Sequence, residues 1–234
     1  NIMAHLEGLK EQAGVAACRF ITDGMALGLG TGSTVRYSII EIARMISQDG
    51  IEVVGVPTSE STRELAQSLG IPLTDLSKVR NLDLTIDGAD EFDANFDLIK
   101  GGGGALTREK IVALASKSMI VVADETKKVG TLGAFDLPVE VERESWEEAS
   151  SEISKLCPGP VNLRGGADPY VTDNGGFILD CKFGATIDRP ASLEGPIKDI
   201  PGVVEVGLFV DICDAVVMAS EGGISILMNP MGRL

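Results

Sequence analysis

The sequence predicts an α/β fold in which a parallel sheet is covered by helices on both faces and a smaller α+β module is inserted. Apolar strand-like segments alternate with amphipathic helical segments up to about residue 134, and this alternation is typical of parallel sheets. From Phe135 the pattern changes to strand, helix, hairpin, helix and strand. Apolar residues make up 44% of the 234 residues and aromatic residues only 4%, so we expect an aliphatic core.

Helices are predicted where apolar residues recur at intervals of three or four. The first covers 3–20, with Leu9 and Ala13 on one face, and the second begins after two good N-cap residues, Ser33 and Thr34. Further helices are expected over 59–69, from the N-cap candidate Thr107, over 146–157 and over 191–200.

Strands are predicted where short apolar runs are bounded by turn residues. They are expected at 25–29, 51–56, near 73, at 82–86, 118–123, 137–141, 203–209, 215–219 and 224–228. A hairpin is predicted over 170–183, around Asp-Asn-Gly-Gly at 173–176. These elements predict two domains, which are 1–133 plus 207–234 and the inserted 134–206.

Charge and residue usage disfavour several classes of function. The net charge of −15 repels phosphate backbones, so no nucleic-acid partner is expected. His5 is the only histidine, which speaks against a histidine-based triad or a multi-histidine metal site. The four cysteines form no CxxC pair, as in a reduced, cytoplasmic protein. No apolar run approaches ~20 residues and no signal-peptide pattern is seen, so no membrane span is expected.

A glycine-rich turn, G-L-G-T-G-S-T-V, follows the first predicted strand at 28–35. The amides of such a turn and of the next helix start can bind an anion. The turn lacks the lysine of a P-loop, and Ser33 replaces the third glycine of the dinucleotide fingerprint. A monophosphate cradle of amides and hydroxyls fits better. A tight turn without a ligand explains this motif equally well when it is taken alone.

The stretch 85–110 carries further polar groups. Asp87 and Asp90 follow a predicted buried strand, and the carboxyl ends of parallel strands are where ligands bind in open sheets. Lys100 precedes four glycines whose bare amides can approach a ligand. Glu109 lies at a predicted helix start, and Lys127 follows the next strand.

These groups fit two kinds of chemistry. Three carboxylates could coordinate a hard cation such as Mg²⁺, although two lysines would compete with the metal for them. A carboxylate base, a lysine and a phosphate cradle also suit metal-free proton transfer beside a carbonyl. Each residue has a structural interpretation as well. The aspartates could cap a turn, Glu109 could be an ordinary first-turn glutamate, and the lysines could be solvated.

Three motifs together strongly resemble ribose-5-phosphate isomerase of type A: G-L-G-T-G-S-T at 28–34, D-G-A-D-E at 87–91 and K-G-G-G-G-A-L-T-R-E-K at 100–110. Their order and spacing agree with that family from about Leu9 to Phe209. The resemblance implies a Rossmann-like domain interrupted by a smaller α+β domain, assembled as homodimers or tetramers. It implies interconversion of D-ribose 5-phosphate and D-ribulose 5-phosphate in the non-oxidative pentose phosphate pathway, without metal or cofactor.

The resemblance also implies a role for each site residue. Glu109 matches the base that moves a proton between C1 and C2 through a cis-enediolate, and Lys100 the lysine that stabilises the oxyanion. Asp87 matches the carboxylate associated with ring opening, and Asp90 its neighbour in the sugar-hydroxyl network. Lys10 falls where the family often has a lysine near the phosphate. The implied substrate contacts are Thr31, Gly32, Ser33, Thr34, Asp87, Gly88, Ala89, Asp90, Lys100, Gly101, Gly102, Gly103 and Lys127.

Two alternatives of other classes remain open from the sequence. A sugar-phosphate deaminase or hydrolase on a similar scaffold would typically recruit a histidine, and none lies near these loops. A non-catalytic sugar-phosphate sensor could keep the turn at 31–34, but it would not need Glu109.

Overall fold

The computed structural model describes the whole chain, residues 1–234, which folds into two compact units. The first unit is Asn1–Ala89, Arg108–Lys128 and Asp211–Leu234, and the second is Asp90–Thr107 and Val129–Val210. The predicted domain bounds differ from these units chiefly because residues 90–107 belong to the second unit. None of the helices combines the length and apolar character that spanning a membrane requires.

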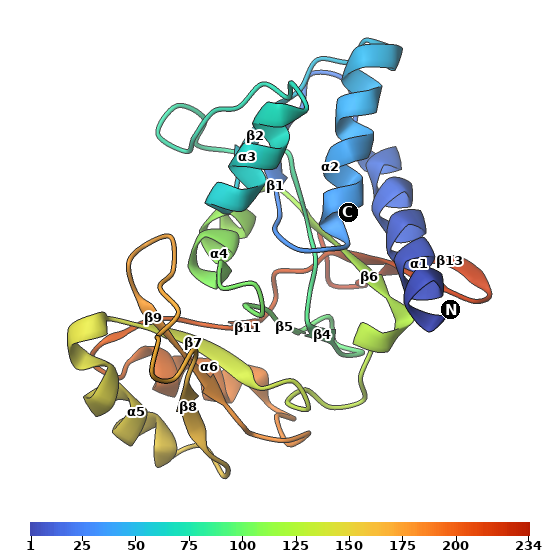
Figure 1. The fold of residues 1–234 in the computed structure, drawn as a ribbon. Coiled ribbons are helices and arrows are strands. Elements are labelled where there is room, and N and C mark those ends of the chain that lie inside the picture. The colour runs from blue at the N-terminus through green and yellow to red at the C-terminus, as the bar shows by residue number, and fades with distance from the viewer. The chain divides into compact units, whose positions relative to one another are not determined.

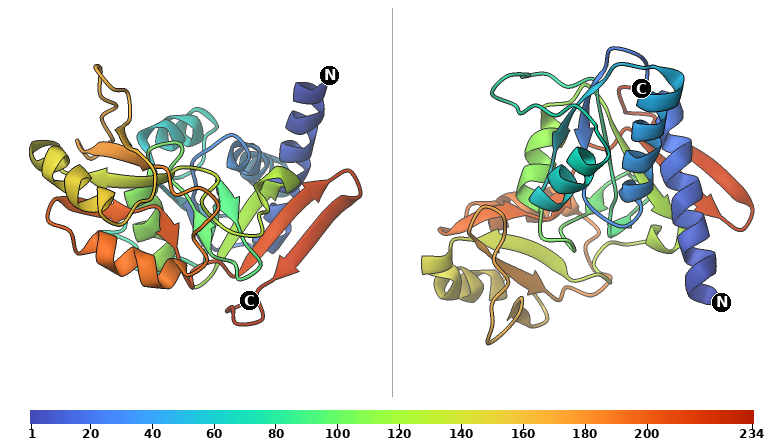
Figure 2. Two further views of the ribbon diagram at one scale, coloured as in Figure 1. Left: turned by 90° about the horizontal axis from the view of Figure 1, so that it is seen from below. Right: turned by 45° about the horizontal axis from the view of Figure 1, so that its top comes forward.

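A six-stranded sheet forms the centre of the first unit (Figure 1). In sheet order its strands are β13 (Gly223–Met228), β12 (Ala215–Ser220), β6 (Met119–Asp124), β3 (Leu84–Asp87), β1 (Ala26–Leu29) and β2 (Val54–Pro57). Every neighbouring pair is parallel except β12 and β13, which form an antiparallel hairpin at one edge (Figure 2). The predicted parallel sheet is therefore confirmed, with one antiparallel edge strand.

Helices cover both faces of this sheet, as predicted. They are α1 (Ile2–Ala17), α2 (Val35–Arg44), α3 (Glu60–Ser68) and α4 (Leu106–Leu114), with 3-10 turns at Cys18–Phe20 and Glu125–Lys127 and a π turn at Met45–Asp49. Leu27 and Leu29 of β1 share one apolar core with Ile39 of α2. Gly28 lies between them and faces Val112 of α4. Since successive residues of a strand face opposite sides, α2 and α4 pack on opposite faces.

The second unit contains two small antiparallel sheets. In sheet order the larger has β10 (Val203–Val206), β7 (Leu137–Val141), β9 (Phe177–Cys181) and β8 (Val161–Leu163), and the smaller has β11 (Leu208–Phe209), β5 (Leu98–Ile99) and β4 (Glu91–Phe92). Two helices, α5 (Trp146–Ser154) and α6 (Pro190–Lys198), and a 3-10 turn at Arg143–Ser145 complete it. Ile153 and Ile197 join these helices to a core that includes Val139 and Leu179. The α+β character expected of the module is confirmed.

The hairpin predicted over 170–183 is wrong in its first arm. The turn exists, since the Thr172 amide donates to the Gly176 carbonyl at 2.9 Å. The partner strands of β9 are β7 and β8, however, and residues 164–172 form an irregular loop. β8 is only three residues long, with the sequence V-N-L, and is too short to show a clear alternation of apolar and polar residues.

Of the three predicted N-cap residues, Ser33, Thr34 and Thr107, only Thr34 occupies an N-cap position in the structure. Thr107 lies inside α4, which begins at Leu106, and its hydroxyl donates to Oε1 of Glu140 at 2.6 Å instead of capping the helix. Thr34 does occupy the N-cap position of α2, but its side chain makes no capping hydrogen bond. The first amides of α2 are therefore not covered by their own N-cap.

Candidate active site

The phosphate turn predicted at 31–34 joins β1 to α2 in the first unit, and Thr31 is anchored inside it. The Thr31 amide donates to Oδ1 of Asp87 at 3.1 Å. Its hydroxyl lies within hydrogen-bond distance of three other hydroxyls, those of Thr58, Ser59 and Thr62, at 2.7, 2.8 and 3.2 Å. Both polar groups of Thr31 therefore shape the turn, and the donors open to a ligand come from the residues after it.

Three consecutive amides of the turn are open. The N–H groups of Gly32, Ser33 and Thr34 donate to no group of the protein. They directly precede α2, where the helix dipole favours an anion. Nζ of Lys10 lies 3.1 Å from Oγ of Ser33, so an ammonium stands beside the amides. Open amides, a hydroxyl and a cation are the groups that bind a phosphate monoester.

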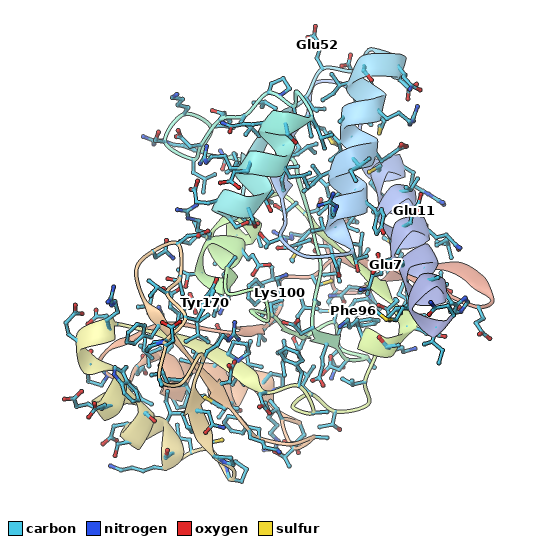
Figure 3. All side chains as sticks on the ribbon, in the orientation of Figure 1. Glu7, Glu11, Glu52, Phe96, Lys100 and Tyr170 are labelled. Atoms are coloured by element: carbon cyan, nitrogen blue, oxygen red, sulfur yellow. The ribbon has the colours of Figure 1, made fainter.

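The position of Lys10 depends on its neighbours on α1 and α2. Its ammonium lies 3.4 Å from Oε1 of Glu7, and the Tyr37 hydroxyl donates to the same carboxylate at 2.6 Å. This hydrogen bond lowers the pKa of Glu7 and raises the pKa of Tyr37. The Glu7 carboxylate, labelled on α1 in Figure 3, is therefore ionised and holds the Lys10 ammonium near the turn.

A cavity of about 310 Å³ opens beside the turn, and Arg36 of α2 and Ser61 and Thr62 of α3 line its other sides. Arg36 is exposed, and its guanidinium makes no hydrogen bond or ion pair within the protein. The site thus offers a phosphorylated ligand a second cation, in a chain whose net charge of −15 repels phosphate.

Asp87 is fully buried at the end of β3 and lies against this turn. Its Oδ1 accepts hydrogen bonds from the amides of Thr31, at 3.1 Å, and Gly88, at 2.7 Å. Gly30 makes the contact possible, because a Cβ at that position would lie 2.6 Å from Cα of Asp87. The turn-binding interpretation of Asp87 is therefore correct, and it places a buried carboxylate at the strand end that the sequence predicted.

Glu109 lies in the first turn of α4, and only 4% of the residue is exposed. The opposite end of α4 is fixed at the start of β3, because the Leu82 amide donates to the Ala115 carbonyl at 2.9 Å. The first turn of the helix therefore points toward the carboxyl ends of the strands, where Asp87 lies. An ordinary first-turn glutamate would be solvated, and Glu109 is not.

Lys127 stands just beyond the carboxyl end of β6, as predicted, in the 3-10 turn Glu125–Lys127, and is half-buried. Asp124 begins this turn. It is fully buried, and its Oδ1 accepts the Thr126 amide at 2.9 Å while Oδ2 has no hydrogen-bond partner. The backbone that carries Lys127 is thus fixed by a buried carboxylate.

The second unit carries Asp90 and the glycine run. The Asp90 amide donates to the Ile99 carbonyl at 2.9 Å, and its Oδ2 accepts the Gly102 amide at 2.8 Å. The run closes on itself because the Gly104 amide donates to the Gly101 carbonyl at 3.0 Å. Asp90 therefore does bind a turn, and that turn is the glycine run predicted to meet a ligand.

Lys100 precedes the glycines and is 2% exposed, so the interpretation of it as a solvated lysine is wrong. Its amide donates to the Gly207 carbonyl at 2.9 Å, and Nζ lies 5.5 Å from the centre of the Phe209 ring. A buried ammonium against an aromatic face is a positioned cation. No group of three or more His, Cys, Asp or Glu side chains is arranged to hold a metal ion.

Comparison with known proteins places the chain in a family. Residues 54–223 match the family model described as ribose 5-phosphate isomerase A (phosphoriboisomerase A). The chain belongs to this family. Ribose-5-phosphate isomerase A 1 of Oceanobacillus iheyensis is 48% identical to it, over 96% of this chain and 100% of that protein. Ribose-5-phosphate isomerase A of Rhodopseudomonas palustris is 49% identical, over 95% and 98% of the two chains.

Solved structures of the ribose-5-phosphate isomerase family have the same fold. One D-ribose-5-phosphate isomerase, in complex with phospho-erythronic acid, is 40% identical and superposes with a TM-score of 0.92 over 95% of this chain and 99% of that one. The ribose 5-phosphate isomerase of Plasmodium falciparum gives 0.91 at 35% identity, over 96% and 99%. The Rossmann-like fold class and the family predicted from three short motifs are thereby confirmed.

The sequence-based prediction missed several groups that shape the site. The hydroxyl cluster of Thr58, Ser59 and Thr62 follows β2 in the run P-T-S-E-S-T, and its place after a predicted strand end was a usable signal. The contacts of Arg164 and Tyr170 with the glycine run had no such signal, because these residues lie in an irregular loop more than sixty positions away.

Proposed function

We propose that this chain interconverts D-ribose 5-phosphate and D-ribulose 5-phosphate through a cis-enediolate. The observation that carries the proposal is the likeness, over nearly the whole chain, to proteins named ribose-5-phosphate isomerase A. The substrate is a sugar phosphate, as for the family. A deaminase, a hydrolase or a non-catalytic sensor is not favoured by these relatives.

Glu109 is the base that removes the proton from C2 of the open-chain aldose and returns it to C1. Burial keeps bulk water away from the carboxylate, so the abstracted proton can be held for the return step. Lys100 stabilises the oxyanion that forms at the carbonyl oxygen. Its burial supports this role, because an ammonium removed from water interacts more strongly with a developing charge.

The other site residues bind and prepare the sugar. Asp87 assists opening of the furanose ring, and Asp90 binds sugar hydroxyls together with its glycine neighbours. The phosphate binds the open amides of Gly32, Ser33 and Thr34, and Lys127 contributes a further substrate contact. A relative that binds phospho-erythronic acid, which carries a phosphate and a carboxylate on one short chain, supports a site with two anion-binding ends. The reaction needs no metal or cofactor.

The proposal extends to the cellular setting. The reaction serves the non-oxidative pentose phosphate pathway, as the family implies. Four free, buried cysteines fit a reducing compartment, so we place the protein in the cytoplasm. Resemblance to the family supports a homo-oligomer, a dimer or a tetramer. Light scattering on the purified protein measures the mass of the assembly. A monomeric mass at all concentrations would contradict the proposed homo-oligomer.

The deciding experiment follows ribose 5-phosphate in deuterated water with the wild-type protein and Glu109→Gln. The wild type should form the ketose with any exchanged deuterium at C1, in the presence of a chelator. Glu109→Gln should lower kcat by about 10²–10⁴, because a positioned base typically contributes that much, with KM changed little.

Glu125→Gln is the matched control, because Glu125 is also a first-turn glutamate but is exposed. It should keep wild-type turnover. Near-normal turnover in Glu109→Gln would show that Glu109 is not the catalytic base. Absence of ketose formation by the wild type would contradict the function itself.

A further inference from the structure

The glycine run of the second unit is held by a group that lies far from it in the sequence. Nη1 of Arg164 donates to the carbonyls of Gly101, at 3.0 Å, and Gly102, at 3.2 Å. The guanidinium is itself fixed by Asp180, whose oxygens accept from Nε at 2.9 Å and Nη2 at 2.6 Å. This two-pronged ion pair fixes the plane of the guanidinium as well as its position.

The loop that follows Arg164 packs over the same run. The Tyr170 amide donates to the Arg164 carbonyl at 2.9 Å, and the Tyr170 ring centre lies 5.8 Å from the guanidinium carbon. A Cβ on Gly104 would lie 2.6 Å from the Tyr170 ring. Arg164 therefore lies under an aromatic cover, with side-chain exposure of only 20%.

The hydrogen bonds of Arg164 affect the amide groups of the glycine run. The carbonyl of Gly102 belongs to the same peptide group as the N–H of Gly103, which donates to no protein group. A charged donor on the carbonyl orients this peptide and polarises its N–H. The preceding N–H, that of Gly102, is already taken by Asp90. Glycines have more conformational freedom than any other residue, so the run depends on such hydrogen bonds to hold one conformation.

We propose that Arg164, held by Asp180, is a positioning residue that orients and polarises the Gly103 amide for the oxyanion that develops at the carbonyl end of the sugar. The inference rests on the proposed function, since it deepens the role of the glycine run beside Lys100. Arg164 does not touch the substrate in this proposal and acts through the two carbonyls. An ammonium cannot replace it, because a lysine cannot grip Asp180 and donate to two carbonyls in one plane.

The test compares Arg164→Ala, Arg164→Lys and the control Arg143→Ala. Arg143 lies in the same unit with its guanidinium 5.1 Å from the Phe177 ring, and no contact links it to the glycines. Arg164→Ala should lower kcat by about tenfold to a hundredfold, the range expected for hydrogen bonds to a charged group, and change KM for ribose 5-phosphate less. Arg164→Lys should be similarly impaired, and Arg143→Ala should keep wild-type kcat.

Two further readouts separate positioning from a structural role. Millimolar guanidinium ion should restore part of the kcat of Arg164→Ala and leave the control unchanged. Calorimetry should show that Arg164→Ala binds phospho-erythronic acid about tenfold more weakly, with guanidinium again restoring affinity. Wild-type kcat in Arg164→Ala, or a loss that guanidinium does not restore in either assay, would overturn the proposal. If the wild type shows no isomerase activity, the proposed function fails, whereas the calorimetry still decides the role of Arg164.

Discussion

Asp87 illustrates how one side chain serves both the fold and the site. It is fully buried, and Oδ1 binds the amides of Thr31 and Gly88. Removing the carboxylate would release the phosphate turn together with any contribution to ring opening. Kinetics of an Asp87 variant would therefore mix the two effects, and Glu109, which lies on a different element, offers the cleaner test of chemistry.

The close approach of Gly30 to Asp87 leads to a prediction about stability and binding. In Gly30→Ala the added Cβ would lie 2.6 Å from Cα of Asp87, a distance that requires backbone movement. We expect a loss of about 1–3 kcal/mol in the free energy of unfolding, as for overpacked sites, and weaker substrate binding because the turn moves. Denaturant unfolding and KM measure the two effects.

Gly8→Ala is the control for this substitution. Gly8 lies within α1, and a Cβ added there would meet no other atom within 4 Å. The same change there should stabilise the protein by about 0.5–1 kcal/mol, since alanine is the better helix former, and leave KM unaltered. If both substitutions changed stability and KM equally, the close contact of Gly30 with Asp87 could not be the cause.

At the scale of elements, the start of α3 links helix capping to the phosphate turn. Ser59 is the N-cap of α3, and its Oγ accepts the Thr62 amide at 3.1 Å and also contacts the Thr31 hydroxyl at 2.8 Å. Ser59→Ala should reduce the free energy of unfolding by about 0.5–2 kcal/mol through loss of the cap, and raise KM because Thr31 loses a partner.

Ser68→Ala tests the specificity of that effect. Ser68 is exposed in the last turn of the same helix, and its hydroxyl donates only to the Leu65 carbonyl. It should leave KM unchanged and alter stability by less than about 0.5 kcal/mol. Denaturant melts of both variants, with KM from the isomerase assay, make the comparison. A larger loss for Ser68→Ala than for Ser59→Ala would rule out capping as the cause.

Elements of the main sheet were predictable because their apolar runs are long and their boundaries carry turn residues. The predicted strand at 118–123 corresponds to β6, all six residues of which are buried. β8 escaped prediction because three residues cannot display a period, and the arm before the turn at 173–176 was misjudged because Arg164 and Tyr170 fix it as a loop. The local pattern of apolar and polar residues thus predicts strands that pair within a regular sheet. It fails where side-chain contacts between distant residues determine the backbone conformation.

At the scale of the whole molecule, the residues of the candidate site could be predicted from three sequence motifs. The contacts that bury these residues could not. Asp87, Lys100 and Glu109 stand out by residue type and by their place after strands or before a helix. Their burial, at 0, 2 and 4% exposure, could not be predicted. Burial depends on packing between distant segments, such as the Phe209 ring beside Lys100.

The cysteines give a prediction for the folded molecule. All four are free and buried. Burial raises the pKa of Cys18 to about 12 and also raises those of Cys157 and Cys181. Because the thiolate is the reactive form, the native protein at pH 8 should react slowly with a thiol reagent, and reactivity should rise only as pH approaches the raised values.

Unfolding in denaturant should expose all four thiols to the reagent at once. Titration with a chromogenic disulfide reagent counts the reactive thiols in the native and in the unfolded protein. Rapid reaction of one thiol in the native protein would show that its segment opens locally. The assay therefore also measures how cooperatively the two cores, which hold Cys18 and Cys181 respectively, are maintained.

The order in which the main sheet is completed has a consequence for biosynthesis. β12 pairs in parallel with β6 in a register that joins Ala215 to Ile120, so a nascent chain carries an unpaired, mostly apolar edge of β6 until β12 has left the ribosome. A truncated chain ending at residue 210 should accumulate in inclusion bodies, whereas the chain of residues 1–234 should be recovered in the soluble fraction. Recovery of that fragment as a folded monomer would show that the edge is protected in another way.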